Sequence, residues 1–425
     1  MNTSLTQIRN LKALLEISKA LGLEFLLDNL LKLILDKTTE VMDAERSSLF
    51  LYDPKKNELW SKIAQGITWK EIRVPMGLGI IGNVAKTRTL TNIPDAYLDP
   101  RFNPEFDKKS NFCTKAILCH PLVGTDGQLV GVIEILNKKT GGSFNKDDEE
   151  LLEALGGQAT IALQRAQLVD SYIESQKMEE TLKQARDIQM SFLPNTLSIS
   201  QKTDKLGIYA IVEPAKVVGG DFYDFFFLDD DHLCFAIGDV SGKGIPAALF
   251  MAVTSTLFKA LTLKEMSPAQ ILAKINNNLV YNNDKCMFVT FFCGILKLST
   301  GEIEYSNGGH NHPYIVHNDQ TFNAIKDSIN IPLGILEEFT FSSSTTCLQK
   351  GDILLLYTDG INEAMDIEGN QYSYKLFETL LKSRPFASAH DLINTTIKEV
   401  KGFIKEATQS DDITLFAIHF KSNPL

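Results

Sequence analysis

Cysteine is scarce in this sequence, and its six cysteines include no CxxC pair. Disulfide-rich secreted domains and zinc modules depend on paired or clustered cysteines, so neither class is indicated. Most of the six stand inside apolar runs. We therefore expect reduced, buried thiols in a cytoplasmic protein.

Long apolar runs are absent too, and so is an excess of basic charge. The longest apolar candidate, residues 23–35, is interrupted by charged side chains and is too polar to span a bilayer. The N-terminal segment lacks the apolar core and the cleavage site of a signal peptide. A net charge of −11 opposes broad attraction to nucleic acid or anionic lipid. We expect protein or small-molecule partners, without nucleic acid or membrane.

A length of 425 residues predicts two domains, because single hydrophobic cores rarely grow so large. An early segment has helical spacing, and both later regions mix strand and helix patterns. We expect a two-domain α+β protein. Its expected parts are an N-terminal helix at 1–22, a first domain at 23–168, a helical linker at 169–193 and a second domain at 194–425.

A helical pattern runs from Asp147 to Phe192, with an early interruption at Gly156 and Gly157. Small or apolar residues recur along it in steps of four and three, as in a seam between two helices. The seam consists of Leu155, Ala159, Ala162, Ala166, Val169 and Ile173. Its register breaks before Met178. Two interpretations stay open: one helix that changes its packing partner, or a parallel coiled coil in a homodimer.

Acidic side chains stand where strongly apolar strands begin or end. They are Asp221, Asp239, Asp359 and the pair Asp411 and Asp412. The runs 233–237 and 353–357 are apolar at every position, which is typical of strands inside a layered sandwich. We therefore expect the carboxylates to gather along the rim of a sheet. A single Asp beside a strand is commonly a turn former, so the set carries more weight than any member.

Carboxylates collected without Lys or Arg beside them repel one another in a partly dry cleft, so a cation is expected to offset them. Oxygen ligands without Cys or His favour Mg or Mn over zinc. Two such ions close together lower the pKa of a water and stabilise the charge of a phosphoryl group. No protein nucleophile is then required.

Seven motifs occur in order between residues 185 and 420. They are Ala185-Arg186-Asp187-Ile188-Gln189, Leu193-Pro194, Gly219-Gly220-Asp221-Phe222-Tyr223-Asp224, Asp239-Val240-Ser241-Gly242-Lys243-Gly244, Gly308-Gly309-His310, Tyr357-Thr358-Asp359-Gly360 and Asp411-Asp412-Ile413-Thr414. This set resembles the RsbU/SpoIIE-like branch of the metal-dependent (PPM, type-2C) phosphatases, bacterial enzymes with an α/β/β/α sandwich. The resemblance implies a protein serine/threonine phosphatase with two Mn or Mg ions.

The resemblance also implies roles for individual residues. Asp239 bridges both metal ions, and the main-chain carbonyl of Val240 completes one site. Asp359 and Asp411 hold the other ion, and Asp221 is reached directly or through water. These four aspartates are the candidate catalytic residues, and with Val240 they are the candidate metal ligands. The implied substrate is a phosphorylated STAS-type anti-sigma-factor antagonist.

Four other patterns are typical of different functions, but the residues in or around each one argue against that function. None of the cysteines has an Arg six positions on, which excludes a cysteine phosphatase. Residues 242–244 lack the spacing of a Walker A loop and are interpreted as the turn before a helix. Residues 77–82 match GxGxxG, but the segment before them carries a Pro and is no buried parallel strand. We interpret His310 and His312 as turn residues rather than as a metal pair.

A second resemblance covers residues 25–168. It is carried by Ala44–Leu51, Asn92–Tyr97, Ile117–Cys119 and the set Asn137, Lys138, Phe144, Asp148 and Glu149. These segments resemble GAF domains of cyclic-nucleotide phosphodiesterases and cyclases, which have a mixed α/β fold with a central antiparallel sheet. The five-residue set resembles a structural clasp near the nucleotide pocket.

Ser48, Tyr97, Ser110 and Thr114 fall where that subfamily contacts purine and phosphate. The resemblance therefore implies cAMP or cGMP as the effector, and hydroxyl groups suit a single phosphate charge. Two alternatives stay open, a GAF domain used only for dimerisation and one that binds another small ligand.

Together the two resemblances predict a sensor that regulates a phosphatase. Our hypothesis is that an effector in the first domain alters the helical linker, and that residues 185–194 pass the change to the acidic segment 219–224. Two rival functions stay open. One is a signalling scaffold that binds its partner without turnover, and the other is a metal-dependent phosphohydrolase for small molecules.

Overall fold

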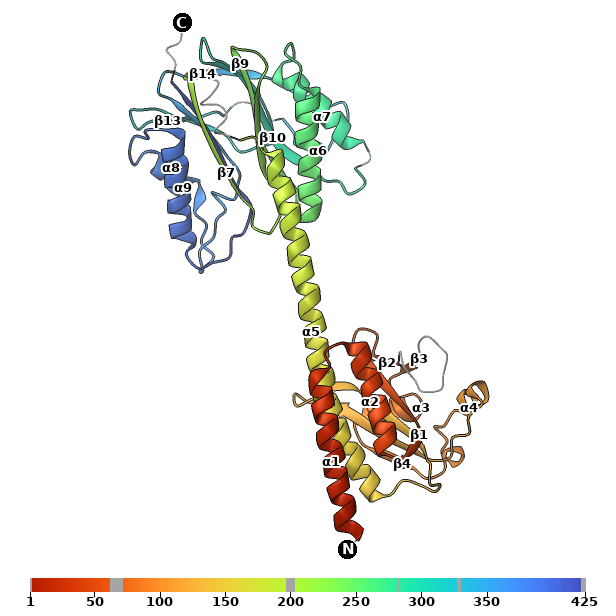
Figure 1. The fold of residues 1–425 in the computed structure, drawn as a ribbon. Helices are drawn as coiled ribbons and strands as arrows, with labels where there is room; N and C mark the ends of the chain where they lie inside the picture. Colours follow the sequence, from red (N-terminus) through yellow and green to blue (C-terminus); the bar gives the residue numbers. More distant parts are fainter. Residues whose placement is uncertain (1, 62–71, 196–202, 282, 327–329, 422–425) are drawn as a thin grey trace. The chain divides into compact units, whose positions relative to one another are not determined.

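The structure is a computed structural model that describes residues 2–61, 72–195, 203–281, 283–326 and 330–421. The chain divides into two compact units, Met1–Met178 and Glu179–Leu425 (Figure 1). Among the described helices, none is both long and apolar enough to cross a membrane.

The first unit is built on a six-stranded antiparallel sheet. In spatial order its strands are β3 (Ile72–Pro75), β2 (Glu58–Ser61), β1 (Ala44–Asp53), β6 (Leu129–Lys138), β5 (Ile117–Val123) and β4 (Thr91–Ile93). The helices are α1 (Asn2–Leu23), α2 (Leu27–Val41), α3 (Gly79–Thr87), α4 (Glu105–Ser110) and α5 (Lys146–Phe192), with a 3-10 helix at Ala96–Leu98. The predicted mixed fold with a central antiparallel sheet is confirmed.

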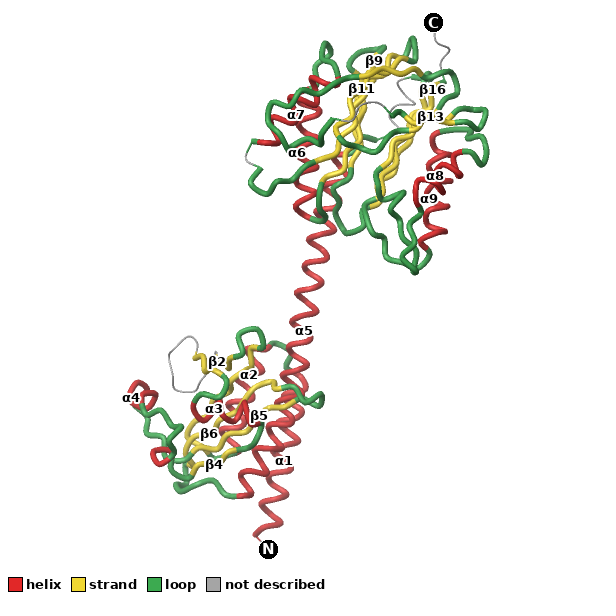
Figure 2. Tube along the Cα trace, turned by 180° about the vertical axis from the view of Figure 1, so that it is seen from behind, coloured by secondary structure: helices red, strands yellow, loops and turns green. Residues whose placement is uncertain are grey.

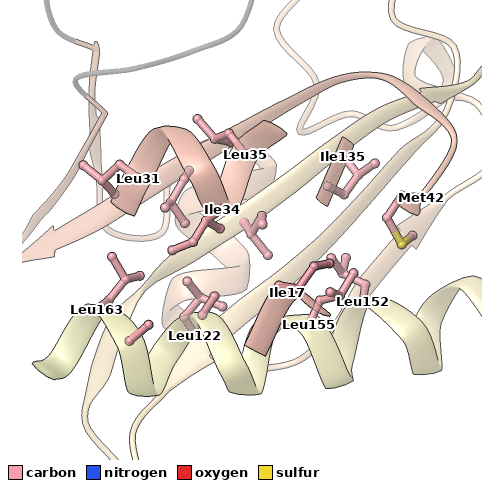
Figure 3. Close-up of a cluster of buried hydrophobic side chains, with 14 of the residues drawn as sticks. Ile17, Leu31, Ile34, Leu35, Met42, Leu122, Ile135, Leu152, Leu155 and Leu163 are labelled. Carbon is pink, nitrogen blue, oxygen red and sulfur yellow. The ribbon is translucent and has the colours of Figure 1, made fainter. Parts of the chain in front are cut away.

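Helices α1, α2 and α5 bury one apolar core against this sheet. Figure 3 shows Ile17 of α1, Ile34 of α2 and Leu155 of α5 in this cluster. The guanidinium of Arg165 on α5 donates hydrogen bonds of 2.7 to 2.9 Å to main-chain oxygens of residues 21, 22 and 24. These bonds satisfy carbonyls at the C-terminal end of α1, which ends at Leu23, one residue after the N-terminal helix expected at 1–22.

Helix α5 is continuous through Gly156 and Gly157, so the predicted interruption there is wrong. A Cβ on Gly156 would lie 2.5 Å from the His120 ring, whereas one on Gly157 would meet nothing within 4 Å. Gly156 therefore lets the helix lie close against β5. The packing of the helix on the sheet outweighs the poor helix propensity of glycine.

Gly156→Ala is expected to destabilise the protein by about 1–3 kcal/mol, because the added methyl group must displace a packed ring. Its matched control, Gly157→Ala, is expected to stabilise by about 0.5–1 kcal/mol through helix propensity alone. Urea unfolding followed by circular dichroism measures both changes. Equal shifts in the two variants would contradict the packing argument.

The second unit consists of two five-stranded antiparallel sheets with a pair of helices outside each (Figure 2). One sheet has the order β14 (Ser344–Cys347), β11 (Glu302–Gly308), β10 (Val289–Lys297), β9 (His232–Val240) and β8 (Phe222–Phe227). The other has the order β13 (Phe322–Ala324), β12 (Tyr314–Val316), β15 (Ile353–Tyr357), β16 (Ile413–Phe420) and β7 (Leu206–Glu213). The helices are α6 (Ile245–Leu261), α7 (Pro268–Val280), α8 (Ser373–Leu381) and α9 (Ala389–Ile404).

Strand β9 explains how the sequence builds these layers. Leu233, Phe235 and Ile237 pack between the two sheets, while Cys234 and Ala236 pack in the cluster beneath α6 and α7. All five are fully buried. A strand covered on both faces needs apolar residues at every position, and the predicted α/β/β/α sandwich is confirmed.

The six cysteines are free, but only three of them are buried. The exposed ones are Cys113, Cys286 and Cys347. The prediction of buried thiols is thus wrong for half of the set. Cys347 lies on the edge strand β14, where alternate residues are exposed, and Cys286 lies outside the regular elements.

Candidate active site

Both sheets of the second unit contribute aspartates to one site. Asp221 directly precedes β8, and Asp239 is the second-last residue of the antiparallel neighbour β9. Asp359 follows β15, and Asp411 and Asp412 directly precede its antiparallel neighbour β16. Asp239 interacts electrostatically with Asp359 and Asp411 from the other sheet. The structure therefore brings the five predicted carboxylates together.

Burial and mutual repulsion shift the titration of these groups. Burial, followed by the charges of Asp239 and Asp412, raises the pKa of Asp221 well above its ordinary value. Burial and Asp359 raise the pKa of Asp239 to about 7. Burial and Asp411 raise the pKa of Asp359 to about 6. A desolvated group of like charges such as this one is stabilised by cations.

Hydrogen bonds fix the inner part of the cluster. The carboxyl of Asp221 lies close enough to that of Asp239 for the two charges to repel each other. The hydroxyl of Thr358 donates to Asp221 Oδ2 at 2.6 Å. Asp221 is only 3% exposed, so it is the deepest carboxyl of the site together with Asp412.

The donor set fits hard divalent cations such as Mg or Mn, because it offers several carboxylate oxygens and a main-chain carbonyl. No group of three or more His, Cys, Asp or Glu side chains in the described ranges is arranged so that it could hold a metal ion as it stands. The assignment of a metal site therefore rests on the type of oxygen donors and on the mutual repulsion of the carboxylates. It does not rest on a preformed arrangement of ligands.

The adjacent acids Asp411 and Asp412 have different environments. Both oxygens of Asp412 accept main-chain hydrogen bonds of 2.7 Å, one from Ala215 and one from Gly220. Asp411 is less buried, and its Oδ2 lies 3.0 Å from the ammonium of Lys243. The main-chain bonds give Asp412 a structural role, and they leave Asp411 as the better candidate ligand of the pair.

Lys243 was not expected at this site. The sequence suggested carboxylates without Lys or Arg beside them, and this is wrong, because the Lys243 ammonium pairs with Asp411 and donates to the carbonyl of Ser410. The turn before α6 places it there, with Gly242 and Gly244 at φ of 84° and 76°. The turn itself was predicted. The pairing was not, because it joins residues 168 positions apart.

His310 has the structural role that the sequence favours. Its Nδ1 lies 2.8 Å from Thr290 Oγ1, and Thr290 stands opposite Asp239 in the β9–β10 ladder. The side chain of Asn307 holds both the N–H and the carbonyl of His310. Burial lowers the pKa of His310 to about 4, so the ring is neutral near pH 7.

In the first unit, a structural clasp is formed within the five-residue set of Asn137, Lys138, Phe144, Asp148 and Glu149. Lys138 Nζ lies 2.6 Å from Asp148 Oδ2, which ties β6 to the start of α5. The side chain of Asn137 bonds to main-chain groups at residues 113, 115 and 116. These contacts hold the end of β6 against the start of β5 and of α5, as expected of a structural element.

Residues 229–421 match the family of stage II sporulation protein E (SpoIIE), and residues 26–163 match the GAF domain family. The chain therefore contains a SpoIIE domain and, before it, a GAF domain. The two matches divide between the two structural units, the GAF domain in the first and the SpoIIE domain in the second.

Several known proteins are similar to parts of this chain. Protein IcfG of Synechocystis sp. is 30% identical over 269 residues, which are 56% of this chain and 41% of that protein. Phosphoserine phosphatase RsbU of Bacillus subtilis is 28% identical over 247 residues, 58% of this chain and 72% of RsbU. Dual 3',5'-cyclic-AMP and -GMP phosphodiesterase 11A of Takifugu rubripes is 39% identical over 140 residues, 30% of this chain and 16% of that protein. The chain thus spans less than half of IcfG and of the phosphodiesterase.

The SpoIIE domain also shares its fold with a solved structure, the SiaA-PP2C domain of Pseudomonas aeruginosa. The TM-score is 0.52 at 19% identity, over 58% of this chain and 99% of that one. At this identity the likeness concerns the fold alone.

The GAF domain contains a cavity of about 150 Å³. Ser48 and Thr114 line it, as the resemblance implies. Tyr97 is not among the lining residues; the residue is 55% exposed and its hydroxyl donates to Asp107 at 3.1 Å. The side chain of Ser110 lies outside the described residues. Because β3 is antiparallel to β2, the GxGxxG segment at 77–82 does not follow a parallel strand.

Charged side chains line the same cavity, and the sequence did not single them out. They are Arg46, Arg101, Asp107 and Glu134. Glu134 stands opposite Ser48 in the β1–β6 ladder, and burial, followed by Asp107, raises its pKa to about 7. One feature of the sequence could have indicated Glu134: it is the one acidic residue inside the apolar run of β6. The cavity therefore offers both hydrogen-bond donors and acceptors to a ligand.

Proposed function

We propose that this chain is a metal-dependent protein phosphatase that hydrolyses phosphoserine or phosphothreonine, in the cytoplasm, on a STAS-type anti-sigma-factor antagonist. The observation that carries the proposal is the group of Asp221, Asp239, Asp359 and Asp411 at one end of a PP2C sandwich, where burial and neighbouring carboxylates raise the pKa of the first three. The similarity to RsbU, which is named a phosphoserine phosphatase, supports the substrate class.

Two Mn or Mg ions, when bound, supply the positive charge that stabilises a phosphoryl group and activates a water. Asp239 is the proposed ligand of both ions; the Val240 carbonyl would complete one site, and Asp359 and Asp411 would hold the other ion. Asp221 acts directly or through a water. Asp412 keeps the Asp221 loop in place through its main-chain hydrogen bonds.

Phosphate release from a phosphoserine peptide, with and without Mn, tests the proposal. We expect release that requires Mn and stops with a chelator, and slower release from nucleotides. Comparable turnover of nucleotides would favour a small-molecule phosphohydrolase. Binding of a phosphoprotein without release would favour a scaffold and contradict the enzyme.

Lys243→Met is expected to raise the affinity of the site for Mn several-fold. The Lys243 ammonium lies 3.0 Å from Asp411 Oδ2 and competes with a metal cation for the same carboxylate. Calorimetric titration with Mn at low salt measures the effect, and added salt is expected to reduce it. Lys285→Met, which alters an exposed lysine, is the control. Weaker Mn binding by Lys243→Met would contradict this argument.

We propose cAMP or cGMP as the ligand of the GAF domain, with Ser48, Tyr97, Ser110 and Thr114 as candidate contacts. The similarity to a cyclic-nucleotide phosphodiesterase and the position of Ser48 and Thr114 in the cavity support this ligand. The cavity is smaller than the roughly 300 Å³ of typical ligand sites, so nucleotide binding has to widen it.

Isothermal titration of Met1–Met178 with both nucleotides tests the ligand, and Thr114→Val is the variant expected to weaken binding. No heat from either nucleotide up to about millimolar concentration would exclude them. A role in dimerisation alone, or another small ligand, would then remain.

We also propose a homodimer that pairs through the exposed part of α5. The first four of the six residues of the predicted seam, up to Ala166, are buried within their own unit instead of between chains. Beyond it, residues 171–180 are all exposed, and large apolar side chains at Leu168, Tyr172 and Met178 stand in water. Sedimentation equilibrium is expected to give a dimer that Tyr172→Glu weakens. A monomeric wild type would contradict the pairing.

A further inference from the structure

A hairpin formed by residues 364–372 lies beside the candidate active site, shortly after Asp359 in the chain. The N–H of Tyr372 donates to the carbonyl of Ala364 at 2.8 Å and closes the hairpin. At its turn, the carboxylate of Asp366 accepts hydrogen bonds of 2.9 Å from two main-chain N–H groups. Local hydrogen bonds therefore fix the shape of this hairpin.

The base of the hairpin is held next to two of the proposed metal ligands. The N–H of Glu363 donates to the carbonyl of Asp359 at 2.8 Å, and the hydroxyl of Ser410 donates to the carbonyl of Glu363 at 3.3 Å. Ser410 directly precedes Asp411. A protein that brings a phosphoserine to these carboxylates must therefore lie close to the hairpin, because a serine side chain is too short to reach the site from a distance.

The hairpin and the start of α8 expose apolar side chains beside the site. Ile367, in the turn of the hairpin, is 72% exposed, and Met365 is also exposed. Tyr374, in the first turn of α8, is 50% exposed, and its phenol interacts electrostatically with Asp359 and Glu363. Exposed apolar side chains that gather next to a reactive site are typical of a surface that another protein covers.

The charge of the same surface is negative. Residues 359–374 contain four acids and no Lys or Arg. The acids are Asp359, Glu363, Asp366 and Glu368. When metal ions offset Asp359, the other three carboxylates keep their charge, and they attract Lys and Arg side chains of a partner.

We propose that the 364–372 hairpin and Tyr374 form the docking surface for the protein substrate, and that this surface selects phosphoserine segments flanked by basic and apolar residues. Ile367 contacts an apolar side chain of the segment, and Glu368 pairs with one of its Lys or Arg side chains. The proposal rests on the phosphatase function proposed above and specifies its substrate. A second copy of this chain suits the surface less well, because its net charge of −11 opposes binding to an acidic surface.

Two phosphoserine peptides of equal length test this selection in the full chain at saturating Mn. One peptide carries Lys and Leu on both sides of the phosphoserine, and the other carries Glu and Ser at the same positions. We expect kcat/KM to be about tenfold higher for the Lys/Leu peptide. Added salt should reduce this preference, because it screens the attraction between exposed charges. Initial rates of phosphate release measure both effects.

Ile367→Gln and Glu368→Lys are expected to weaken the preference in different ways. Ile367→Gln loses the apolar contact, so the ratio of the two kcat/KM values should fall several-fold. Glu368→Lys reverses a charge, so its kcat/KM for the Glu/Ser peptide should rise above that of the wild type. A general structural defect would lower both values and could not produce this rise.

Leu263→Gln is the matched control, and it should leave the preference unchanged. Leu263 is 54% exposed. Its neighbour Lys264 pairs with Asp229 in the turn between β8 and β9. This turn lies at the end of the two strands that is opposite to the site aspartates.

Equal kcat/KM for the two peptides in the wild type overturns the proposal, and so does a preference that both variants retain. Sedimentation equilibrium examines the other occupant. If Ile367→Gln dissociates a dimer and keeps the peptide preference, a second copy covers the surface and the proposal is overturned.

Fluorescence anisotropy with labelled, unphosphorylated forms of the two peptides measures docking without turnover. We expect the Lys/Leu form to bind more tightly, and Ile367→Gln to weaken its binding. Equal binding of the two forms overturns the docking surface. If the wild type binds with this preference but releases no phosphate, the docking surface is supported and the phosphatase function alone is refuted.

Discussion

Asp239→Asn is expected to reduce Mn-dependent phosphate release by about a thousandfold. Asp239 is the carboxylate that interacts with all of the others: its charge raises the pKa of Asp221, and Asp359, Asp411 and Asp412 act on it electrostatically. The amide has nearly the same shape but lacks the charge that a shared cation requires. Initial rates with a phosphoserine peptide over a range of Mn concentrations measure the loss.

The same substitution is expected to leave the metal-free protein as stable as before, or to make it more stable. It removes one charge from a buried group of like charges, whose repulsion opposes folding when no cation is present. In the wild type Mn should raise the melting temperature by binding the native state, and in Asp239→Asn this increase should vanish. Asp284→Asn, which alters an exposed aspartate, is the control. Retained activity in Asp239→Asn would refute the assignment of the metal site.

The layers of the second unit could be predicted because a strand that is buried on both faces can be recognised from consecutive residues of the sequence. Residues 233–237 are apolar without interruption, and a strand between a sheet and a helix layer requires this. The aspartates could be predicted in the same way, because each one lies at or near the end of a strand. Local patterns therefore predict which carboxylates lie together.

Contacts between segments that lie far apart in the sequence could not be predicted in this way. Lys243 and Asp411 form their ion pair across 168 positions, and Gln189 binds Gly219 across 30. The sequence also could not distinguish Asp411 from Asp412 by physical pattern alone, because their difference lies in the amides that surround Asp412. Gly156 was misjudged for the same reason, since the His120 ring that requires it belongs to another element.

Gly360→Ala is the second change with a large expected effect, because this glycine lies against the main chain that carries Asp411 and Asp412. A Cβ on Gly360 would lie 2.0 Å from the carbonyl oxygen of Asp412 and 2.8 Å from its carbonyl carbon. Main-chain hydrogen bonds hold the two segments together, from Thr358 N to the carbonyl of Thr414 at 3.1 Å. The methyl group can fit only if β15 and β16 separate at the end where the aspartates stand.

We expect Gly360→Ala to destabilise the protein by about 1–3 kcal/mol and to lower phosphate release at saturating Mn by about a hundredfold, because a displacement of about 1 Å in an active site has this cost. Urea unfolding and the rate assay measure the two effects separately. Gly402→Ala in α9 is the matched control: nothing lies within 4 Å of its Cβ position, so it should stabilise the helix by about 0.5–1 kcal/mol and leave the rate unchanged. A stable, fully active Gly360→Ala would mean that β15 and β16 can separate without moving the carboxylates, and the close packing of this rim would then have no catalytic role.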